Sequence, residues 1–319
     1  WDEVKNTDFI YPQDFNSKAF RRFIERTDIT DTSVSTKFLL RNLGIAEFNG
    51  GALDFTNAGV LMFSKNPKQF FIQAEIQCVN WEDKNKDSYT DREIISAPLI
   101  ESINSAIDFV IKNIDSRTVI DSRTRKTKPE IPETVLREAI ANAVMHRDYA
   151  SSRESVQIFI YPSKIEIRNP GGLVPGMRKE DLGKKSVRRN PIVADMLDRA
   201  GFVERSGTGI SRMMRRMKEE GFPDPEFNMN SHFEVILSRK RSAEIPDLSE
   251  ADLSERQKKE LEYAYRNGQI TTSKAEEITN ENLTYQSFYL DLRDMVEKGF
   301  LQKVGEGKGT YYTPPNSEI

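Results

Sequence analysis

The strongest structural signal in this chain is the stretch Glu138-Ala139-Ile140-Ala141-Asn142-Ala143-Val144-Met145-His146-Arg147-Asp148-Tyr149. It predicts the end of a helix that opens near Pro132, because apolar residues recur there at the three- and four-residue steps of one face. On such a helix Glu138 and Asn142 lie four residues apart and point together, away from the centre of the apolar face. The helix therefore presents a carboxylate and an amide side by side.

Two interpretations of this pair are compatible with its spacing. The simpler one makes Glu138 and Asn142 the solvated side of an amphipathic helix. Two later stretches argue for a functional pair instead. Residues 165–173 form an alternating strand that runs into a glycine turn, and residues 204–210 form a second glycine turn that opens a helix.

The order of these features carries more information than any one of them. A helix with a Glu/Asn pair, a strand ending in glycines, a variable loop and a Gly-Thr-Gly at a helix start together resemble the GHKL ATPase fold. The similarity is greatest to the divergent branch found at the C-terminal side of Schlafen-like AlbA_2 proteins, a RecG-helicase-related group described as transcriptional regulators. The resemblance spans residues 16–238.

The resemblance implies an ATP site that uses Mg²⁺. It assigns Glu138 to polarise the water that attacks the γ-phosphate, and Asn142 to hold the Mg²⁺ between the phosphates. The phosphates would lie on the second glycine turn, where backbone N–H groups and the positive end of a helix dipole favour anions. That turn consists of Gly207, Thr208 and Gly209.

The resemblance places the adenine side of the pocket at Asn169, Gly171 and Gly172. Here the sequence departs from the wider superfamily, which uses an aspartate to accept a hydrogen bond from the adenine amino group. The Asn169 oxygen can still accept this bond, although it lacks the charge assistance of a carboxylate. Adenine selectivity is therefore the weakest part of the implied site.

The sequence leaves open the roles of two features near the implied ATP site. The basic run at residues 177–189 lies where the superfamily has its ATP lid. It could fold over phosphates, stay solvated or contact a DNA backbone. His146 is either a general base or a structural hydrogen-bonding residue, and the negative pole of the helix end favours its protonated form.

The expected fold class is α+β, with a GHKL-like α/β sandwich core, an N-terminal α+β scaffold and a C-terminal winged-helix domain. We place the scaffold at residues 1–130, the ATP-binding core at 131–238, a charged linker at 239–250 and the winged-helix-like domain at 251–319. Capping boxes at residues 254–257 and 273–276 each predict a helix start in the last domain. A third helix, capped by Thr284 and ended by Gly299, precedes a hairpin.

The third helix of a winged helix usually enters the DNA major groove, and Tyr285, Gln286, Ser287, Tyr289 and Arg293 are the expected exposed residues. The same helix contains Asp291, Asp294 and Glu297, which oppose phosphate. The domain therefore either binds DNA or docks a protein, including a second copy of this chain.

Composition excludes several other classes of protein. With 47 Lys and Arg against 50 Asp and Glu, net charge does not indicate nucleic-acid binding. The lone Cys78 lies in an apolar run that predicts burial, and two histidines without a cysteine cluster argue against zinc. Neither an apolar run of membrane length nor a signal peptide is present, which predicts a cytoplasmic protein without membrane partners. A helicase is not indicated, because the sequence lacks a phosphate loop of the Gly-x-x-x-x-Gly-Lys type.

Two hypotheses of different classes follow. In the first, the chain is an ATP-binding regulatory module, with slow Mg²⁺-dependent hydrolysis at Glu138, that couples nucleotide to DNA or partner binding. In the second, it is a non-catalytic DNA-binding or dimerisation module with a degenerate pocket. Because the chain starts at Trp1 without Met, the resemblance also implies a DNA-binding-like domain upstream.

Overall fold

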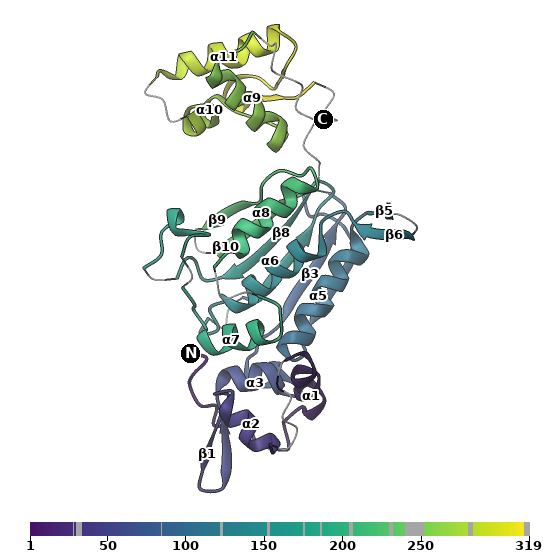
Figure 1. Ribbon diagram of the computed structural model, residues 1–319, viewed down its shortest axis with the longest axis vertical. Helices are drawn as coiled ribbons and strands as arrows, with labels where there is room; N and C mark the ends of the chain where they lie inside the picture. The colour runs from purple at the N-terminus through teal and green to yellow at the C-terminus, as the bar shows by residue number, and fades with distance from the viewer. Residues whose placement is uncertain are drawn as a thin grey trace. The chain divides into compact units, whose positions relative to one another are not determined.

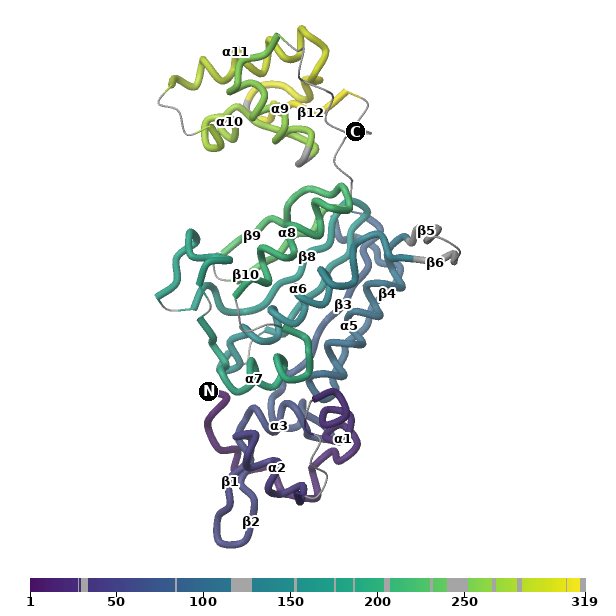
Figure 2. Tube along the Cα trace, in the orientation of Figure 1, coloured from purple at the N-terminus to yellow at the C-terminus, as the bar shows by residue number. Residues whose placement is uncertain are grey.

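The computed structural model (Figures 1 and 2) describes residues 1–27, 29, 34–83, 85–121, 124–151, 154–174, 176–185, 187–203, 207–229, 232–239, 252–279 and 283–315. The predicted linker lies outside these residues except for Arg239. The chain divides into two units: Trp1–Arg216 with Pro225–Leu237, and Met217–Asp224 with Ser238–Ile319. Among the described residues, no helix is both long enough and apolar enough to cross a membrane.

A six-stranded mixed sheet forms the centre of the first unit. Its strand order is β4-β3-β7-β8-β10-β9, with bounds Ile76–Trp81 (β3), Tyr89–Ile95 (β4), Val156–Ile160 (β7), Lys164–Pro170 (β8), Glu226–Met229 (β9) and His232–Ser238 (β10). β3 pairs with β7 in parallel, whereas β3 with β4, β7 with β8 and β9 with β10 are antiparallel. The segment assigned to the scaffold thus contributes two strands to the same sheet as the predicted core.

Two long helices cover one face of this sheet. α5 (Leu99–Asn113) and α6 (Glu133–Met145) pack against each other, α5 contacts β3, and α6 contacts β8 (Figure 1). The strands alternate, so that Ile158 and Ile167 pair and are fully buried on this face. α6 begins directly after Pro132, whose missing N–H costs nothing at a helix start. The helix predicted from residues 136–144 is confirmed.

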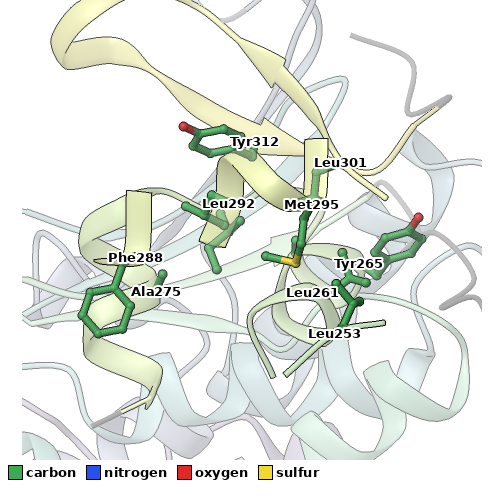
Figure 3. Packing of buried hydrophobic residues seen from close by; sticks show 11 residues of the cluster. Leu253, Leu261, Tyr265, Ala275, Phe288, Leu292, Met295, Leu301 and Tyr312 are labelled. Carbon is green, nitrogen blue, oxygen red and sulfur yellow. The ribbon is translucent and has the colours of Figure 1, made fainter. Parts of the chain in front are cut away.

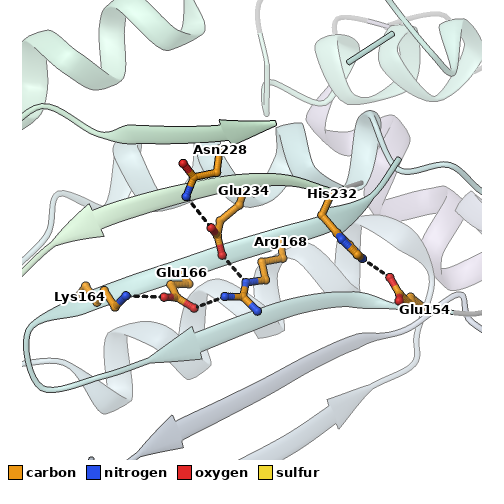
Figure 4. Close-up of polar contacts among 7 residues, drawn as sticks. All are labelled: Glu154, Lys164, Glu166, Arg168, Asn228, His232 and Glu234. Atoms are coloured by element: carbon orange, nitrogen blue, oxygen red, sulfur yellow. Dashed lines mark hydrogen bonds and ion pairs between the residues drawn. The ribbon is translucent and has the colours of Figure 1, made fainter. Parts of the chain in front are cut away.

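The opposite face of the sheet carries a chain of charged side chains (Figure 4). Glu166 is 5% exposed and forms ion pairs with Lys164 at 2.6 Å and with Arg168 at 2.8 Å. Arg168 also binds Glu234, which accepts a hydrogen bond from Asn228 at 2.9 Å. These bonds connect β8, β10 and β9, so they fix the register of the strands that close the cavity described below.

The N-terminal part of the first unit is built on aromatic packing. Phe63 is 1% exposed and packs against Phe20 and Phe23, while Phe55 packs against Phe9 and Phe15. The elements are α1 (Ser17–Arg26), α2 (Thr36–Asn42), β1 (Ala46–Asn49), β2 (Ala52–Phe55), α3 (Asn57–Phe63) and α4 (Pro67–Phe70). β5 (Ser116–Asp121) and β6 (Thr124–Pro129) form a separate antiparallel pair.

Three further elements border the cavity of the first unit. They are the 3₁₀ turn η1 (Lys179–Asp181), α7 (Pro191–Arg199) and α8 (Gly209–Glu219). The side chain of Asp2 accepts hydrogen bonds from the backbone N–H groups of Ile192 (2.7 Å) and Val193 (3.1 Å). A carboxylate at a helix N-terminus stabilises it through these bonds and through the dipole. The start of the chain therefore fixes the start of α7.

Among its described residues from 252 onward, the second unit has three α-helices and a two-stranded hairpin. They enclose a hydrophobic cluster (Figure 3). Phe288, Leu292 and Met295 lie on one face of α11 and are fully buried, as their spacing predicts. The elements are α9 (Glu255–Asn267), α10 (Thr272–Thr279), α11 (Tyr285–Glu297), β11 (Gln302–Val304), η2 (Gly307–Gly309) and β12 (Tyr311–Thr313). The capping box at Ser254 is confirmed. The one predicted at Ser273 is wrong, because α10 starts earlier and the Thr271 hydroxyl accepts the N–H of Lys274.

Candidate functional site

A cavity of about 120 Å³ lies between α6, α8 and the end of the sheet. Its walls are mainly apolar, which suits the flat surface of an organic ligand. The polar lining groups are few and come mostly from α6, from the start of α8 and from the basic loop. These lining residues are Glu138, Asn142, His146, Lys185, Arg188 and Asp198, with the backbone of Gly172, Gly183, Gly207 and Gly209.

Glu138 is buried, with 4% of its surface exposed. Its carboxylate oxygen Oε1 accepts a hydrogen bond from the Nδ2 of Asn142 at 3.0 Å. Burial excludes the interpretation of Glu138 as part of a solvated helix face. Because the Asn142 amide gives its nitrogen to Glu138, its oxygen Oδ1 is the atom that can ligate a metal.

Gly209 lies directly against this carboxylate. A Cβ atom built on Gly209 would lie 1.9 Å from Oε1 of Glu138 and 2.7 Å from its carboxyl carbon, much closer than atoms can approach. Any larger residue at this position would displace the buried Glu138 side chain. The absence of a side chain at Gly209 is therefore a structural requirement of the contact between α6 and the start of α8.

Arg212 provides the second partner of Glu138. It lies three residues after Gly209 on α8, and its Nη2 donates to the Oε2 of Glu138 at 2.5 Å. The Arg212 side chain is 26% exposed, whereas that of Glu138 is 5% exposed. Such a charged pair is strong because one partner is screened from water. Both oxygens of the buried carboxylate are thus engaged.

The three residues of the second glycine turn differ in position. Gly207 and Gly209 line the cavity, whereas Thr208 is exposed and is not a lining residue. Gly207 has a φ of +69°, a left-handed conformation that a residue with a Cβ adopts only with strain. The turn therefore depends on glycine at both ends, for a conformational reason at Gly207 and a steric reason at Gly209.

The first glycine turn is only partly at the cavity. Gly172 lines it, but Asn169 and Gly171 are not among its lining residues. Asn169 is 1% exposed, and its Nδ2 lies 3.5 Å from the carbonyl oxygen of Pro170. Gly171 has a φ of +93°, and a Cβ there would lie 2.9 Å from the Cβ of Asp148. These two residues hold the turn against the end of α6.

The basic run forms one wall of the cavity. Leu182, Gly183, Lys185, Val187 and Arg188 line it. The amino group of Lys185 pairs with Asp181 at 2.7 Å, and Nη2 of Arg189 donates to the carbonyl of Gly172 at 2.8 Å. Of the three roles left open by the sequence, this arrangement matches a loop that covers the cavity.

His146 lies at the far end of α6, two turns beyond Glu138. Burial, with the nearby charges of Arg189 and Arg188, lowers the pKa of His146 to about 4. The protonated form expected from the helix dipole is therefore wrong, because desolvation outweighs the dipole. The Nδ1 of His146 is buried and has no hydrogen-bond partner among the described residues.

Asn190 connects the basic loop to the same end of α6. Its Nδ2 donates to the carbonyl oxygens of Met145 and Arg147, each at 2.9 Å. These carbonyls are among the groups that a helix end leaves without an internal partner. The sequence analysis missed Asn190 and Arg212. The Asn-Pro step before α7 was a usable signal for Asn190. The sequence contains no signal for the contact of Arg212, because that contact joins α8 to α6.

Among the described residues, no group of three or more His, Cys, Asp or Glu side chains could hold a metal ion. Mg²⁺ does not need such a group, since it retains several waters and is commonly held by one or two protein oxygens plus phosphates. Asn142 at the edge of the cavity, with the carboxylate of Glu138 beside it, fits that sparse ligand set.

Comparison with known families agrees with this geometry. A family described as "Putative ATP-dependent DNA helicase recG C-terminal" matches residues 154–237. This is an ATPase-like family. The match contains both glycine turns, α7 and the start of α8, but begins after α6 and so excludes Glu138 and Asn142.

One solved structure similar to this chain is that of the DIP2311 protein from Corynebacterium diphtheriae. It has a TM-score of 0.61 and 19% sequence identity, and the similarity covers 99% of this chain and 64% of that one. At this identity the similarity concerns the fold alone. The chain thus spans less than two thirds of the length of its structural relative, and no curated protein matches it.

Proposed function

We propose that the cavity on α6 is an ATP site that uses Mg²⁺, within a GHKL-like core, and that nucleotide binding there regulates the rest of the protein. One observation carries the proposal: Glu138, Asn142 and Gly209 meet at one end of a single cavity. A carboxylate, an amide oxygen and a helix start made of glycine are the groups that a bound triphosphate with its metal needs. The match to an ATPase-like family supports this assignment.

Each residue of the site has a proposed role. The backbone N–H groups at Gly207 and Gly209 bind phosphate oxygens, with Thr208 as the residue between them. Asn142 ligates the metal, whose charge neutralises the crowded phosphates. Glu138 accepts a proton from the attacking water. Gly172 borders the base, and Asn169 and Gly171 shape the turn that positions it.

The cavity is small for this ligand. Sites for drug-sized molecules usually enclose about 300–1,000 Å³, compared with about 120 Å³ here. The described residues of the wall segment, 182–185 and 187–188, belong to no helix or strand, so this is the part of the wall that can move outward. ATP binding is therefore coupled to displacement of this loop, which provides a means of regulation.

A second function is favoured by the contact between Arg212 and Glu138. A cation beside a carboxylate opposes proton transfer to it, so in this state the chain is expected to bind nucleotide without turnover. In that case it is a nucleotide sensor or, with a degenerate pocket, a non-catalytic DNA-binding or dimerisation module.

We further propose that residues 251–319 form a winged-helix-like domain through which a transcriptional regulator contacts DNA or a partner. Two acidic residues of α11 are turned toward α9, because Asp291 binds Arg256 at 2.6 Å and Asp294 binds Gln257 at 2.7 Å. Tyr285 and Leu290 are 57% and 52% exposed. This apolar exposure favours a protein partner, including a second copy, over a phosphate backbone.

The nucleotide site is tested by titration calorimetry with ATP in the presence and absence of Mg²⁺. Wild type should bind Mg²⁺ATP, and Asn142→Ala should lose the Mg²⁺-dependent part of the affinity while its fold is retained. Asn42→Ala, at an exposed position in α2, is the matched control and should bind as wild type does. Unchanged Mg²⁺ dependence in Asn142→Ala rules out the metal assignment.

A further inference from the structure

We infer that Arg212 senses the γ-phosphate and controls whether Glu138 can act as a base. This inference rests on the proposed nucleotide site. It assigns a positioning role to a residue outside both glycine turns and outside the Glu/Asn pair. Its basis is the contact in which Arg212 donates to the Oε2 of Glu138 at 2.5 Å.

The contact prevents base catalysis as long as it persists. Oε1 of Glu138 accepts from Asn142 and Oε2 accepts from Arg212, so both oxygens are engaged within a side chain that is 5% exposed. Each oxygen keeps a second acceptor site, but the positive charge of Arg212 beside the carboxylate opposes the transfer of a proton to it from a water molecule. Asn142 is on the same helix, four residues away, whereas Arg212 comes from α8. Arg212 is therefore the partner that can exchange.

The position of Arg212 gives it an alternative anion. It lies on α8 one turn after Gly209, and the start of α8 is where the phosphates of a bound nucleotide would lie. A guanidinium group carries five N–H donors in a planar fork that fits phosphate oxygens as well as a carboxylate. A terminal phosphate at this helix start competes directly with Glu138 for the same side chain.

The competition has a definite outcome. When a γ-phosphate takes Arg212, the positive charge moves from the base to the group under attack, where it stabilises the charge of the transferring phosphate. Glu138 is released at the same moment and can accept the proton of a water molecule. ADP lacks the γ-phosphate and leaves the contact between Arg212 and Glu138 in place. The site therefore distinguishes ATP from ADP through Arg212.

The experiment measures the dissociation constants of Mg²⁺ATP and Mg²⁺ADP by calorimetry for wild type, Arg212→Ala and Arg215→Ala. Arg215 is exposed on the same helix and serves as the matched control. Wild type and Arg215→Ala should prefer ATP. Arg212→Ala should lose about tenfold or more of this preference, the value of one charge-assisted hydrogen bond, because its ATP affinity falls and its ADP affinity does not.

Arg212→Ala leaves a buried carboxylate without its cation and could fail to fold. The titrations with Mg²⁺ATP and Mg²⁺ADP are therefore repeated with Glu138→Gln and with the double variant Glu138→Gln/Arg212→Ala. Neither of these variants contains an unpaired buried carboxylate. The double variant should lose the ATP preference that Glu138→Gln retains. Equal ATP preference with and without Arg212 overturns the inference but leaves the nucleotide site intact. If wild type binds neither nucleotide, the proposed function fails, and the inference fails with it.

Discussion

The cavity has two ends along α6 with different chemistry, one at Glu138 in the middle of the helix and one at His146, the C-terminal cap. At Glu138 the polar groups are paired with one another, through Asn142 on the same helix and Arg212 on α8. At His146 the ring is neutral, and its Nδ1 has no partner among the described residues. The difference indicates that the Glu138 end is closed by internal contacts that a ligand must replace, whereas the His146 end has a polar atom that a ligand can satisfy directly.

The largest expected effect is at the closed end. Gly209→Val should abolish Mg²⁺ATP binding, because even the first carbon of the new side chain would overlap the Glu138 carboxylate. Calorimetry measures the loss, and circular dichroism checks that the fold is retained. Gly309→Val is the control, since a Cβ at that position meets nothing within 4 Å. Wild-type affinity in a folded Gly209→Val protein would remove the start of α8 from the site.

The next largest effect is expected on ATP turnover, and it separates turnover from ATP binding at the Glu138 end of the cavity. Glu138→Gln should bind Mg²⁺ATP at least as tightly as wild type does, because a neutral amide competes less for Arg212. It should lose turnover by about 10² to 10⁴, because a general base acts only in the transition state. Phosphate release measures the rate, and calorimetry measures the affinity. Hydrolysis at the wild-type rate in this variant would show that Glu138 is not the base. Absence of hydrolysis in a wild type that binds Mg²⁺ATP would instead identify a nucleotide sensor.

The smallest effect is expected at the open end. The folded-state pKa of His146 is about 4, below its ordinary value near 6.5, so the unfolded chain binds more protons between these two pH values. The free energy of unfolding should therefore fall as pH drops from about 6.5 toward 4, by about 3 kcal/mol in total. His146→Gln should show a correspondingly weaker loss.

Urea denaturation followed by tryptophan fluorescence measures this effect in the first unit alone, because both tryptophans, Trp1 and Trp81, lie there. His232→Gln is the control, since His232 is bound to Glu154 (Figure 4) and is not among the lining residues of the cavity. It should retain the acid sensitivity caused by His146. An identical pH dependence in wild type and His146→Gln would contradict the neutral histidine.

The sequence predicted the closed end of the cavity better than the open end, for physical reasons. The four-residue spacing of Glu138 and Asn142 sets their geometry within one helix, and the structure places them in contact. The Gly207–Gly209 turn is a weak signal by itself and was identified from its place in the order of motifs, after the Glu/Asn pair and the first glycine turn. Arg212 could not be assigned to Glu138, because their contact joins two helices and depends on tertiary packing.

The open end depends on burial, which local patterns do not reveal. His146 was expected to be protonated from its place at a helix end, but desolvation dominates its pKa. Asn169 was placed at the base-binding side by resemblance, and the structure locates it in the buried turn beside Pro170. The pairing of β3 with β7 could likewise not be predicted from the sequence, since a parallel pair joins strands far apart in the chain.

The most direct measurement is a crystal structure of the chain with Mg²⁺ and a non-hydrolysable ATP analogue. The account predicts the analogue in the cavity on α6, its phosphates at the start of α8 and Mg²⁺ on the Oδ1 of Asn142. It also predicts that the lining residues Leu182, Gly183, Lys185, Val187 and Arg188 are displaced outward. Density for the nucleotide at another surface, or an unchanged closed cavity at a saturating concentration of the analogue, would contradict it.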